Sequence, residues 1–353
     1  MTYDYLIVGQ GIAGSVLASM LSMRNKSVFI VDKFSENSSS QVAAGLVNPI
    51  TGRRIVKSWM ADEAIPFAQQ FYALMEQEYG TSFFHSVDAL EVTGSIHEYN
   101  EWTRRMDEQN LRKYFKEDSP NELYKNKIRD FIKLVRITSS GWLDIPHFTA
   151  MVRKKWLDKE QLKDEIFDIE KLVLSETGVT YNDVHAKRII FCEGYQCLNN
   201  KFWKDVPLLP AKGEIVVIEC RELPQEFILL SGMFFVPIGN HRFRCGATYE
   251  WKFENDLPTK TGLNKLTEMI TSVLKEEFKI TSHTAGVRPT VKDRRPIIGF
   301  HSNFPNVGIF NGLGTKGVLL SPYFANHFIE SMEDGKTLNP EVNVLRFGRV
   351  NNN

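Results

Sequence analysis

The sequence has few cysteines, no long apolar run and no cationic leader. Its four cysteines include no Cys-x-x-Cys pair and no cluster with histidine at metal-ligand spacing, which excludes a disulfide scaffold and predicts no metal site. No segment approaches the ~18 consecutive apolar residues that span a bilayer. The first residues, MTYDYLIVG, lack the charged and apolar regions of an export signal. We therefore expect a cytoplasmic protein with reduced thiols and no membrane partner.

An excess of charge of either sign is also absent. Lys and Arg number 43 and Asp and Glu number 43, so the formal net charge is zero, whereas proteins that coat nucleic acid or anionic membranes carry dominant positive charge. Apolar residues make up 42% of the chain, with 24 Phe and 6 Trp, which predicts a packed core and excludes global disorder. A length of 353 residues suits two domains at ~150 residues each.

The first thirty-four residues have the pattern of a βαβ unit. Residues 3–8 form a short apolar run, as expected of a strand buried in a parallel sheet. The turn Gly9-Gln10-Gly11-Ile12-Ala13-Gly14 follows, and then SVLASMLSMR, with apolar residues at helical spacing. Residues 27–31 read as a second buried strand, and Asp32 stands at its end.

Each glycine of this turn meets a physical demand of dinucleotide binding. Gly9 permits the tight turn, Gly11 lets a pyrophosphate approach the backbone, and Gly14 lets the helix pack closely on the strand. The helix N-terminus offers free N–H groups to phosphates, and Asp32 is placed to accept hydrogen bonds from ribose hydroxyls. The alternative is a βαβ unit that binds nothing. The context favours a dinucleotide site, and this motif alone leaves FAD and NAD open.

The rest of the chain predicts a second, β-rich domain inserted into the first. Short alternating runs over 210–250, separated by Pro, Gly and Asn, indicate an antiparallel sheet. Residues 307–327 return to strand, glycine loop and helix, so the two ends read as one layered α/β domain. We also expect a hairpin over 178–191 and helices over 60–80, most of 95–135, and 261–278.

Several short motifs resemble, in order, the D-amino-acid-oxidase superfamily of flavoproteins, which includes glycine oxidase and sarcosine oxidase. They are Ala43-Ala44-Gly45-Leu46, Cys192-Glu193-Gly194, Pro210-Ala211-Lys212-Gly213, Gly246-Ala247-Thr248-Tyr249, Ala285-Gly286-Val287-Arg288-Pro289, DRRPIIG at 293–299, and Gly312-Leu313-Gly314-Thr315-Lys316-Gly317. The segments GATYEW and NGLGTKG are similar to the FAD domain of the bifunctional tRNA enzyme that oxidises carboxymethylaminomethyl-uridine.

The resemblance implies an α/β fold in which an FAD-binding Rossmann-like domain carries an inserted β-rich substrate domain. The FAD-binding domain would combine 1–80, 140–209 and 285–353, and the substrate domain 81–139 and 210–284. FAD would be non-covalent, because 286–299 contains no cysteine of the kind that attaches flavin in some relatives. The implied cofactor-binding residues are Gly9, Gly11, Ile12, Ala13, Gly14, Asp32, Lys33, Ala44, Gly45, Leu46, Gly194, Gly312, Gly314, Thr315, Lys316 and Gly317.

Three residues are implied to be catalytic. Arg288 would pair its guanidinium with a substrate carboxylate; the alternative is a structural ion pair with Asp293. Lys316 would help neutralise the reduced flavin or touch substrate, unless it is merely solvated. Tyr249 would line the substrate pocket, unless its ring only packs. In sarcosine oxidase, a lysine in the strand that leads to the glycine of the Gly246-Ala247-Thr248-Tyr249 motif takes part in oxygen activation. In this sequence the nearest cation is Arg244.

The resemblance implies oxidation of a C–N bond in a small amine or amino acid that bears a carboxylate, by hydride transfer to flavin N5. The electron acceptor would be oxygen or another carrier. One alternative is oxidation of a modified tRNA uridine, which the balanced charge and the lack of a methyltransferase segment disfavour. Others are a carrier-linked amine dehydrogenase and a flavoprotein without turnover. The basic run Gly52-Arg53-Arg54 with Lys57 could touch a polyanion or be a solvated face.

Overall fold

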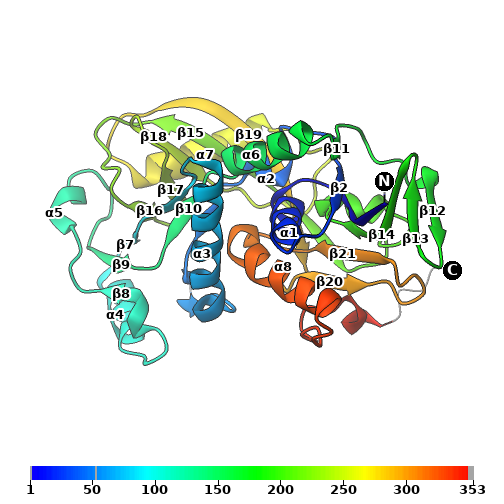
Figure 1. Cartoon of the computed structure of the whole chain (residues 1–353). Coiled ribbons are helices and arrows are strands. Elements are labelled where there is room, and N and C mark those ends of the chain that lie inside the picture. Colours follow the sequence, from blue (N-terminus) through cyan, green and yellow to red (C-terminus); the bar gives the residue numbers. More distant parts are fainter. Residues whose placement is uncertain (1, 52–53, 349–353) are drawn as a thin grey trace. The chain divides into compact units, whose positions relative to one another are not determined.

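The computed structural model describes residues 2–51 and 54–348, and it divides the chain into two compact units (Figure 1). The first unit combines Met1–Gln41, Ile145–Ala211 and Val287–Asn353, and the second combines Val42–Asp144 and Lys212–Gly286. Both units are therefore discontinuous in sequence. Residues 42–80, which we expected with the FAD-binding segments, group with the second unit; the assignment of cofactor and substrate roles to the units stays a prediction.

The first unit is built around a mixed sheet whose central strands are parallel. Its strands lie in the order β11 (Leu162–Lys163), β2 (Val28–Val31), β1 (Thr2–Val8), β14 (Val184–Phe191), β13 (Gly178–Tyr181) and β12 (Leu172–Ser175). The second half of β14 also pairs in parallel with β21 (Val307–Asn311), which pairs antiparallel with β20 (Ile297–Phe300). The predicted strands and the hairpin over 178–191 are confirmed, as is the strand, loop and helix over 307–327.

Helices α1 (Ile12–Met23), α6 (Ile145–Asp158) and α8 (Gly317–Glu333) belong to this unit. Helix α1 packs against both α6 and α8, and Figure 1 shows α1 beside α8. Nine consecutive residues of α1 are buried, because the helix is enclosed between these helices and the sheet. This enclosure explains the small and apolar composition of the segment. Short 3-10 turns complete the unit: η2 (Ile169–Lys171), η3 (Gly194–Asn199) and η4 (Val344–Phe347).

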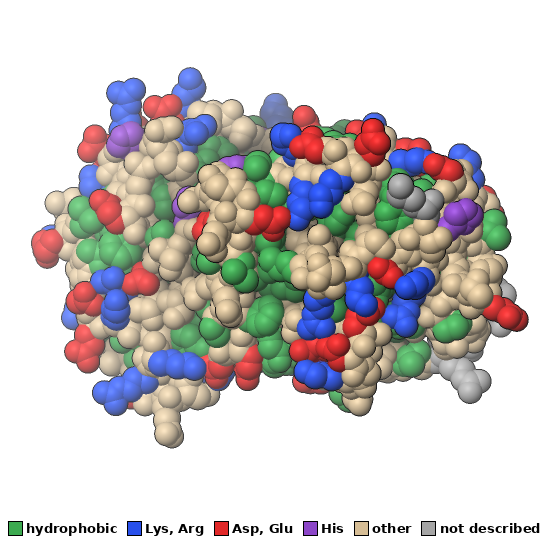
Figure 2. Space-filling model, viewed as in Figure 1, with side chains coloured by type: hydrophobic (Ala, Val, Ile, Leu, Met, Phe, Trp, Pro, Cys, Tyr) green, Lys and Arg blue, Asp and Glu red, His purple; other side chains and the backbone are tan. Residues whose placement is uncertain are grey.

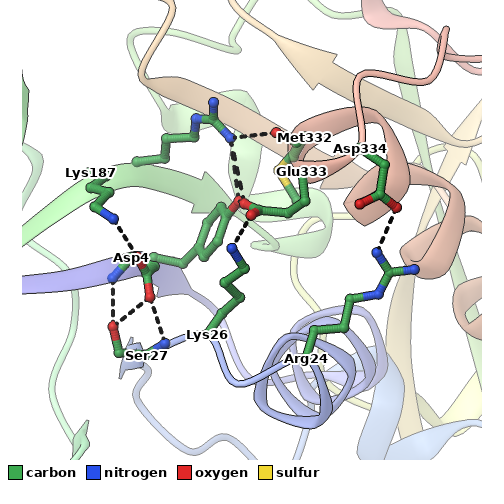
Figure 3. Close-up of polar contacts among 10 residues, drawn as sticks. Asp4, Arg24, Lys26, Ser27, Lys187, Met332, Glu333 and Asp334 are labelled. Carbon is green, nitrogen blue, oxygen red and sulfur yellow. Dashed lines mark hydrogen bonds and ion pairs between the residues drawn. The ribbon is translucent and has the colours of Figure 1, made fainter.

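A polar network ties β1 and β14 to the C-terminal end of α8 (Figure 3). Asp4 accepts hydrogen bonds from the Ser27 hydroxyl at 2.8 Å and from the Lys187 ammonium at 2.7 Å. Glu333 accepts a hydrogen bond from the Tyr5 hydroxyl and also pairs with Lys26 and, at 4.0 Å, with Arg188. The acids and bases of this network neutralise one another, so the network stabilises the fold.

The second unit is built around a large, mainly antiparallel sheet. Its strand order is β19 (Lys279–Val291), β15 (Leu208–Glu219), β18 (Arg242–Gly246), β17 (Phe234–Pro237), β16 (Ile228–Leu230), β7 (Ala89–Thr93), β9 (Lys133–Ile137) and β8 (Phe115–Lys116). Residues 208–211 of β15 and 287–291 of β19 group with the first unit. One face of the sheet forms an apolar cluster with α7 (Lys260–Val273). The antiparallel sheet predicted over 210–250 is confirmed, and the helix predicted over 261–278 is confirmed with an earlier end.

A small three-stranded sheet in this unit joins β3 (Leu46–Val47), β10 (Gly141–Leu143) and β6 (Phe84–Ser86). A two-stranded hairpin pairs β4 (Ile50–Thr51) with β5 (Val56–Lys57). Helix α3 (Ala61–Tyr79) confirms the prediction over 60–80. Helix α2 (Ser39–Val42) is a single turn, and the division of the chain into units falls after its residue Gln41.

The prediction that residues 95–135 are mostly helical was wrong. The segment contains α4 (Ile96–Met106), the 3-10 turn η1 (Arg112–Tyr114) and the short α5 (Asn121–Tyr124), and then becomes strand. The charged composition favours helix locally, but β9 pairs antiparallel with β7 over its whole length and with β8 at its end. Sheet pairing therefore overrides local propensity here.

All four cysteines are buried and none of them is in a disulfide, so they pack as small core residues. Among the described residues, no helix combines the length and apolar character that crossing a bilayer requires. Figure 2 shows basic and acidic side chains interspersed over the visible face, which agrees with the equal totals of the two charges.

Candidate functional site

The glycine turn after β1 has the close backbone contacts that its sequence predicts. Gly9 has φ +95°, and a Cβ there would lie 2.6 Å from the carbonyl oxygen of Cys192. A Cβ at Gly14 would lie 1.9 Å from the carbonyl oxygen of Gly9, so only glycine lets α1 begin directly on the turn. A Cβ at Gly11 would press only on the Ser40 hydroxyl, at 2.8 Å, and that hydroxyl accepts a hydrogen bond from the Ile12 N–H at 2.9 Å.

A cavity of about 270 Å³ opens beside this turn. Its lining residues are Gln10, Gly11, Asp32, Lys33, Phe34, Ser35, Ser38, Gln41, Thr149, Ala150, Arg153, Lys154, Leu157 and Asp158. The Asp32 carboxylate accepts a hydrogen bond from the Gln10 N–H at 2.8 Å and pairs with Arg153 Nη1 at 2.7 Å. Lys33 contributes a further cation at the cavity wall, 3.6 Å from Asp164.

Sequence reasoning missed Arg153. This residue lies on α6, 121 residues from Asp32, and its side chain is only 12% exposed. The one signal available was a cation among the buried positions of an amphipathic helix, between Val152 and Trp156. That signal could not have named its partner.

The second glycine loop lies against the other predicted cofactor segments of the first unit. Asn311 donates a hydrogen bond from Nδ2 to the carbonyl of Gly194 at 2.8 Å, which joins the ends of β21 and β14. Gly312 and Gly314 have positive φ, +73° and +55°. A Cβ at Gly317 would lie 3.0 Å from the side chain of Ile12 at the start of α1. Thr315 is exposed within the loop.

Arg288 lies beside this loop, because the Gly314 N–H donates to the carbonyl of Pro289 at 3.2 Å. The Arg288 side chain is half-buried on β19. Asp293, the alternative partner considered for Arg288, pairs instead with Arg346 at 2.9 Å.

Lys316 is half-buried at the start of α8. Burial disfavours its charged form and the nearby Arg294 repels it, and together they lower the pKa of Lys316 to about 8. The ammonium is therefore close to its neutral form at moderately alkaline pH. Ala13 is buried in the first turn of α1, so only its backbone is available to a ligand.

The remaining predicted residues belong to the second unit. Ala44 is buried and Leu46 half-buried, and Gly45 packs against Leu143, since a Cβ at Gly45 would lie 1.9 Å from the Leu143 carbonyl oxygen. Tyr249 is 43% exposed, and its ring meets that of Trp251 edge to face at 5.0 Å.

The basic run singled out in the sequence is only partly described. Gly52 and Arg53 lie outside the described residues. Lys57 forms a structural ion pair with Asp62 at 2.6 Å, which favours the solvated-face interpretation for that residue.

Comparison with known proteins identifies the family. Residues 4–331 match the family model described as FAD dependent oxidoreductase. The chain belongs to this family. The resemblance to the D-amino-acid-oxidase group is thereby confirmed, and FAD is the cofactor. The first unit of this FAD-dependent oxidoreductase fits that cofactor, since a Cβ would fill its glycine cradle and the carboxylate residue Asp32 lines the cavity beside it.

Among curated relatives, the chain is 24% identical to the tRNA 5-methylaminomethyl-2-thiouridine biosynthesis bifunctional protein of Leptospira interrogans, over 97% of this chain and 59% of that protein. It thus spans about three fifths of the length of that relative. It is 22% identical to the glycine oxidase of Bacillus subtilis, over 91% of this chain and 90% of that one. Both similarities extend over nearly all of this chain.

The solved structures show the same fold. Iminodiacetate oxidase from Chelativorans matches with a TM-score of 0.79 at 18% identity, over 95% of this chain and 96% of that one. Glycine oxidase from Bacillus cereus matches with a TM-score of 0.76 at 21% identity, over the same shares of the two chains. The predicted α/β FAD-binding fold with a β-rich second part is therefore confirmed.

Proposed function

We propose that this FAD-dependent oxidoreductase oxidises a C–N bond in a small amine or amino acid that bears a carboxylate. The observation that carries the proposal is the position of Arg288 on β19, a half-buried arginine whose next residue, Pro289, accepts a backbone hydrogen bond from Gly314 of the glycine loop 312–317. Two relatives, glycine oxidase and iminodiacetate oxidase, bear the names of such substrates. FAD, when bound, supplies the acceptor for the hydride that leaves the carbon next to nitrogen.

Different residues of the first unit would bind the cofactor and the substrate. The Gly9–Gly14 turn and the N-terminus of α1 would hold the pyrophosphate, and Asp32 the ribose. Arg288 would bind the substrate carboxylate through two parallel hydrogen bonds, which fixes the orientation of the carbon to be oxidised. No protein base is needed if the amine binds in its neutral form, and the resulting imine hydrolyses in water.

Lys316 would act on charge rather than on the substrate's proton. Its ammonium, together with the N-terminus of α8, would stabilise negative charge that develops on the cofactor. Because its pKa is about 8, this contribution would be present at neutral pH and lost in alkali. Tyr249 would line the substrate pocket through its hydroxyl.

The proposal is tested by recording the visible spectrum anaerobically before and after adding glycine, sarcosine and a panel of D-amino acids. Loss of the oxidised-flavin band with one of them is expected. The variant Arg288→Gln should raise the KM for that amine at least tenfold, because a charge-assisted bidentate contact is lost. Lys292→Gln, an exposed cation near Arg288 in the chain, is the matched control and should leave KM unchanged. A flavin that no amine in the panel reduces would contradict the proposal.

A second candidate is oxidation of a modified tRNA uridine, favoured by the relative of Leptospira interrogans. Binding of tRNA would depend steeply on salt, because each neutralised phosphate releases counterions. A gel-shift with unmodified tRNA at ~50 mM and ~200 mM salt tests it. Affinity that falls by orders of magnitude supports the tRNA reading, and no shift at either concentration removes it.

The electron acceptor is tested in the same reaction. Hydrogen peroxide formed in proportion to the amine consumed would indicate direct use of oxygen. Turnover only with an added quinone or artificial dye would indicate a carrier-linked dehydrogenase.

A further inference from the structure

Arg153 joins α6 to the ends of β1, β2 and β11 at the wall of the cavity beside the first glycine turn. Its Nη1 donates to the Asp32 carboxylate at 2.7 Å and to Gln10 Oε1 at 3.0 Å. Its Nη2 donates to the Asp32 carbonyl at 3.2 Å and pairs with Asp164 Oδ1 at 3.0 Å. All of these residues belong to the first unit. Each terminal nitrogen carries two hydrogens, so both nitrogens are fully used and the guanidinium is held in one orientation.

Gln10 is itself fixed, so it offers Arg153 a rigid partner. Its Nε2 donates to the Ser15 hydroxyl at 2.8 Å and to the Thr149 carbonyl at 2.9 Å, and the residue is buried. These two bonds leave Oε1 as the amide atom that accepts from Arg153. A continuous polar network therefore connects the glycine turn and the start of α1 with α6.

The contacts of Asp32 orient its carboxylate without using all of its acceptor positions. Oδ1 accepts from the Gln10 N–H at 2.8 Å, and Oδ2 accepts from Arg153 at 2.7 Å. Each carboxylate oxygen has about two acceptor positions, so these bonds leave one position on each oxygen. Asp32 lines the cavity, and its side chain is 19% exposed. Both oxygens can therefore accept a further hydrogen bond from a ligand.

An ion pair that served only the fold would use the guanidinium differently. The strongest arginine–carboxylate pairs are bidentate, with two parallel bonds to the two oxygens. Because Oδ1 of Asp32 already accepts from the Gln10 N–H, a bidentate pair would fill that oxygen. Arg153 instead gives one nitrogen to the side chain and the other to the backbone carbonyl of Asp32. This arrangement suits a ligand that offers two neighbouring hydroxyls.

We propose that Arg153 is a positioning residue that lets Asp32 bind the 2′- and 3′-hydroxyls of the adenosine ribose together. Arg153 does not contact FAD in this assignment; it holds the carboxylate so that each oxygen accepts from one hydroxyl of the cis-diol. The inference rests on the proposed function only for the role of Asp32 toward ribose, and it depends neither on the amine nor on the electron acceptor. It predicts selection for nucleotides that carry both hydroxyls.

Arg153 also carries charge, and its charge acts separately from its geometry. The carboxylates of Asp32 and Asp164 are balanced by two cations. These are Arg153 and Lys33, whose Nζ lies 3.6 Å from Asp164 Oδ1. Loss of the Arg153 charge would leave a net negative charge beside the pyrophosphate, which would weaken every phosphate ligand. Arg153→Lys keeps the charge but lacks the planar fork, so it isolates the geometry.

Binding of ADP and of 2′,3′-dideoxy-ADP to the full-length protein freed of FAD tests the assignment, because the two ligands differ only in the ribose hydroxyls. In titration calorimetry, the wild-type protein should bind ADP about 10- to 100-fold more tightly, since both hydroxyls donate to a charged acceptor. Arg153→Lys should reduce this ratio of affinities to less than about threefold, and the affinity for dideoxy-ADP should stay within about threefold of the wild-type value.

Lys154→Gln is the matched control, because Lys154 is an exposed cation next to Arg153 on α6 and lines the same cavity. It should leave the ratio unchanged. A wild-type ratio in Arg153→Lys would overturn the assignment. Equal weakening of both nucleotides would also overturn it, since that result indicates a structural role. Tighter binding of ADP would do the same, because Arg153 would then compete with ribose for Asp32.

Asp164→Asn provides a second variant in case Arg153→Lys does not fold. Asp164 is exposed, so the fold should tolerate the change, which a thermal melt checks. The substitution removes the charge of one anchor of Arg153 Nη2 and should lower the ratio about two- to fivefold. An unchanged ratio in this folded variant would count against the positioning role.

Asp32→Asn separates this inference from the proposed function. It should reduce the ratio as Arg153→Lys does. If Asp32→Asn abolishes the discrimination and Arg153→Lys does not, the ribose role of Asp32 stands and the positioning role fails. If the wild-type protein binds both nucleotides equally, both roles fail. Reduction of the flavin by an amine is measured separately, so neither result alters the test of C–N oxidation.

Discussion

The glycine turn makes a quantitative prediction about Gly14→Ala. The new Cβ would lie 1.9 Å from the carbonyl oxygen of Gly9, and carbon–oxygen contacts shorter than about 3 Å do not persist in well-packed interiors. Both groups are buried backbone, so α1 and the turn must separate by roughly 1 Å. Overpacking of this kind costs typically 1–3 kcal/mol, and we take about 3 kcal/mol because neither side can rotate away.

A helix gains about 1 kcal/mol when alanine replaces glycine in its interior, which offsets part of that loss. The net expectation is about 2 kcal/mol, or a fall of roughly 4–8 °C in the midpoint for a unit of this size. Because the same shift displaces the phosphate-binding N–H groups, FAD should also be lost. Circular dichroism melting and the flavin-to-protein absorbance ratio after gel filtration measure the two effects.

The control is Gly94→Ala, since a Cβ at Gly94 would find Asp130 O at 3.5 Å, an ordinary contact. Its midpoint and flavin content should match those of the wild-type protein, within about ±0.5 kcal/mol. A Gly14→Ala protein that melts like Gly94→Ala and retains FAD would refute the reasoning about close backbone approach.

Three further predictions concern charge. Asp32→Asn should weaken FAD binding about 10- to 100-fold, because the ribose loses hydrogen bonds to a charged acceptor. The Kd is measured by the quenching of flavin fluorescence when FAD is titrated with apoprotein. An unchanged Kd would remove Asp32 from the FAD site. The Lys316 ammonium loses its proton as pH rises through about 8. The flavin midpoint potential should therefore fall more steeply above that pH in the wild-type protein than in Lys316→Met, which dye-equilibration measurements would show. Parallel plots of potential against pH for the two proteins would contradict a charge-stabilising role of Lys316. Burial raises the pKa of Glu91 to about 8, so the folded protein binds a proton that the unfolded chain has released between about pH 4.5 and pH 8. Stability should therefore fall as pH rises through that window by about 1.4 kcal/mol per pH unit, and Glu91→Gln should recover about 4 kcal/mol at pH 7.5. Urea unfolding at pH 5 and pH 7.5 checks this, and a variant with the wild-type pH dependence would exclude Glu91 as the cause.

Local patterns predicted the parts of the fold whose physics is local. The turn around Gly11, the helix that follows and the loop at Gly314 were all predicted from glycine spacing beside apolar runs, because close backbone approach leaves a direct trace in the sequence. The segment 95–135 was misread because the strand β9 owes its existence to pairing with β7, and such pairing has no local signature.

The partners of the candidate site were the least predictable part. Arg153 meets Asp32 across 121 positions of sequence, and Asn311 meets Gly194 across 117. Contacts of this kind are set by packing of distant elements, so they became visible only in the structure.

The discontinuity of the first unit has a consequence during protein synthesis. Residues 189–191 of β14 pair with residues 307–309 of β21, and α8 covers α1. When the ribosome has made β14, the strand that completes its edge is still untranslated. The edge of β14 at residues 189–191 and one side of α1 therefore stay exposed until β21 and α8 have been synthesised. Edges of this kind are prone to pair with other chains. We expect nascent chains that stop before residue 307 to be aggregation-prone and strongly dependent on chaperones, whereas the full-length chain closes its own edge.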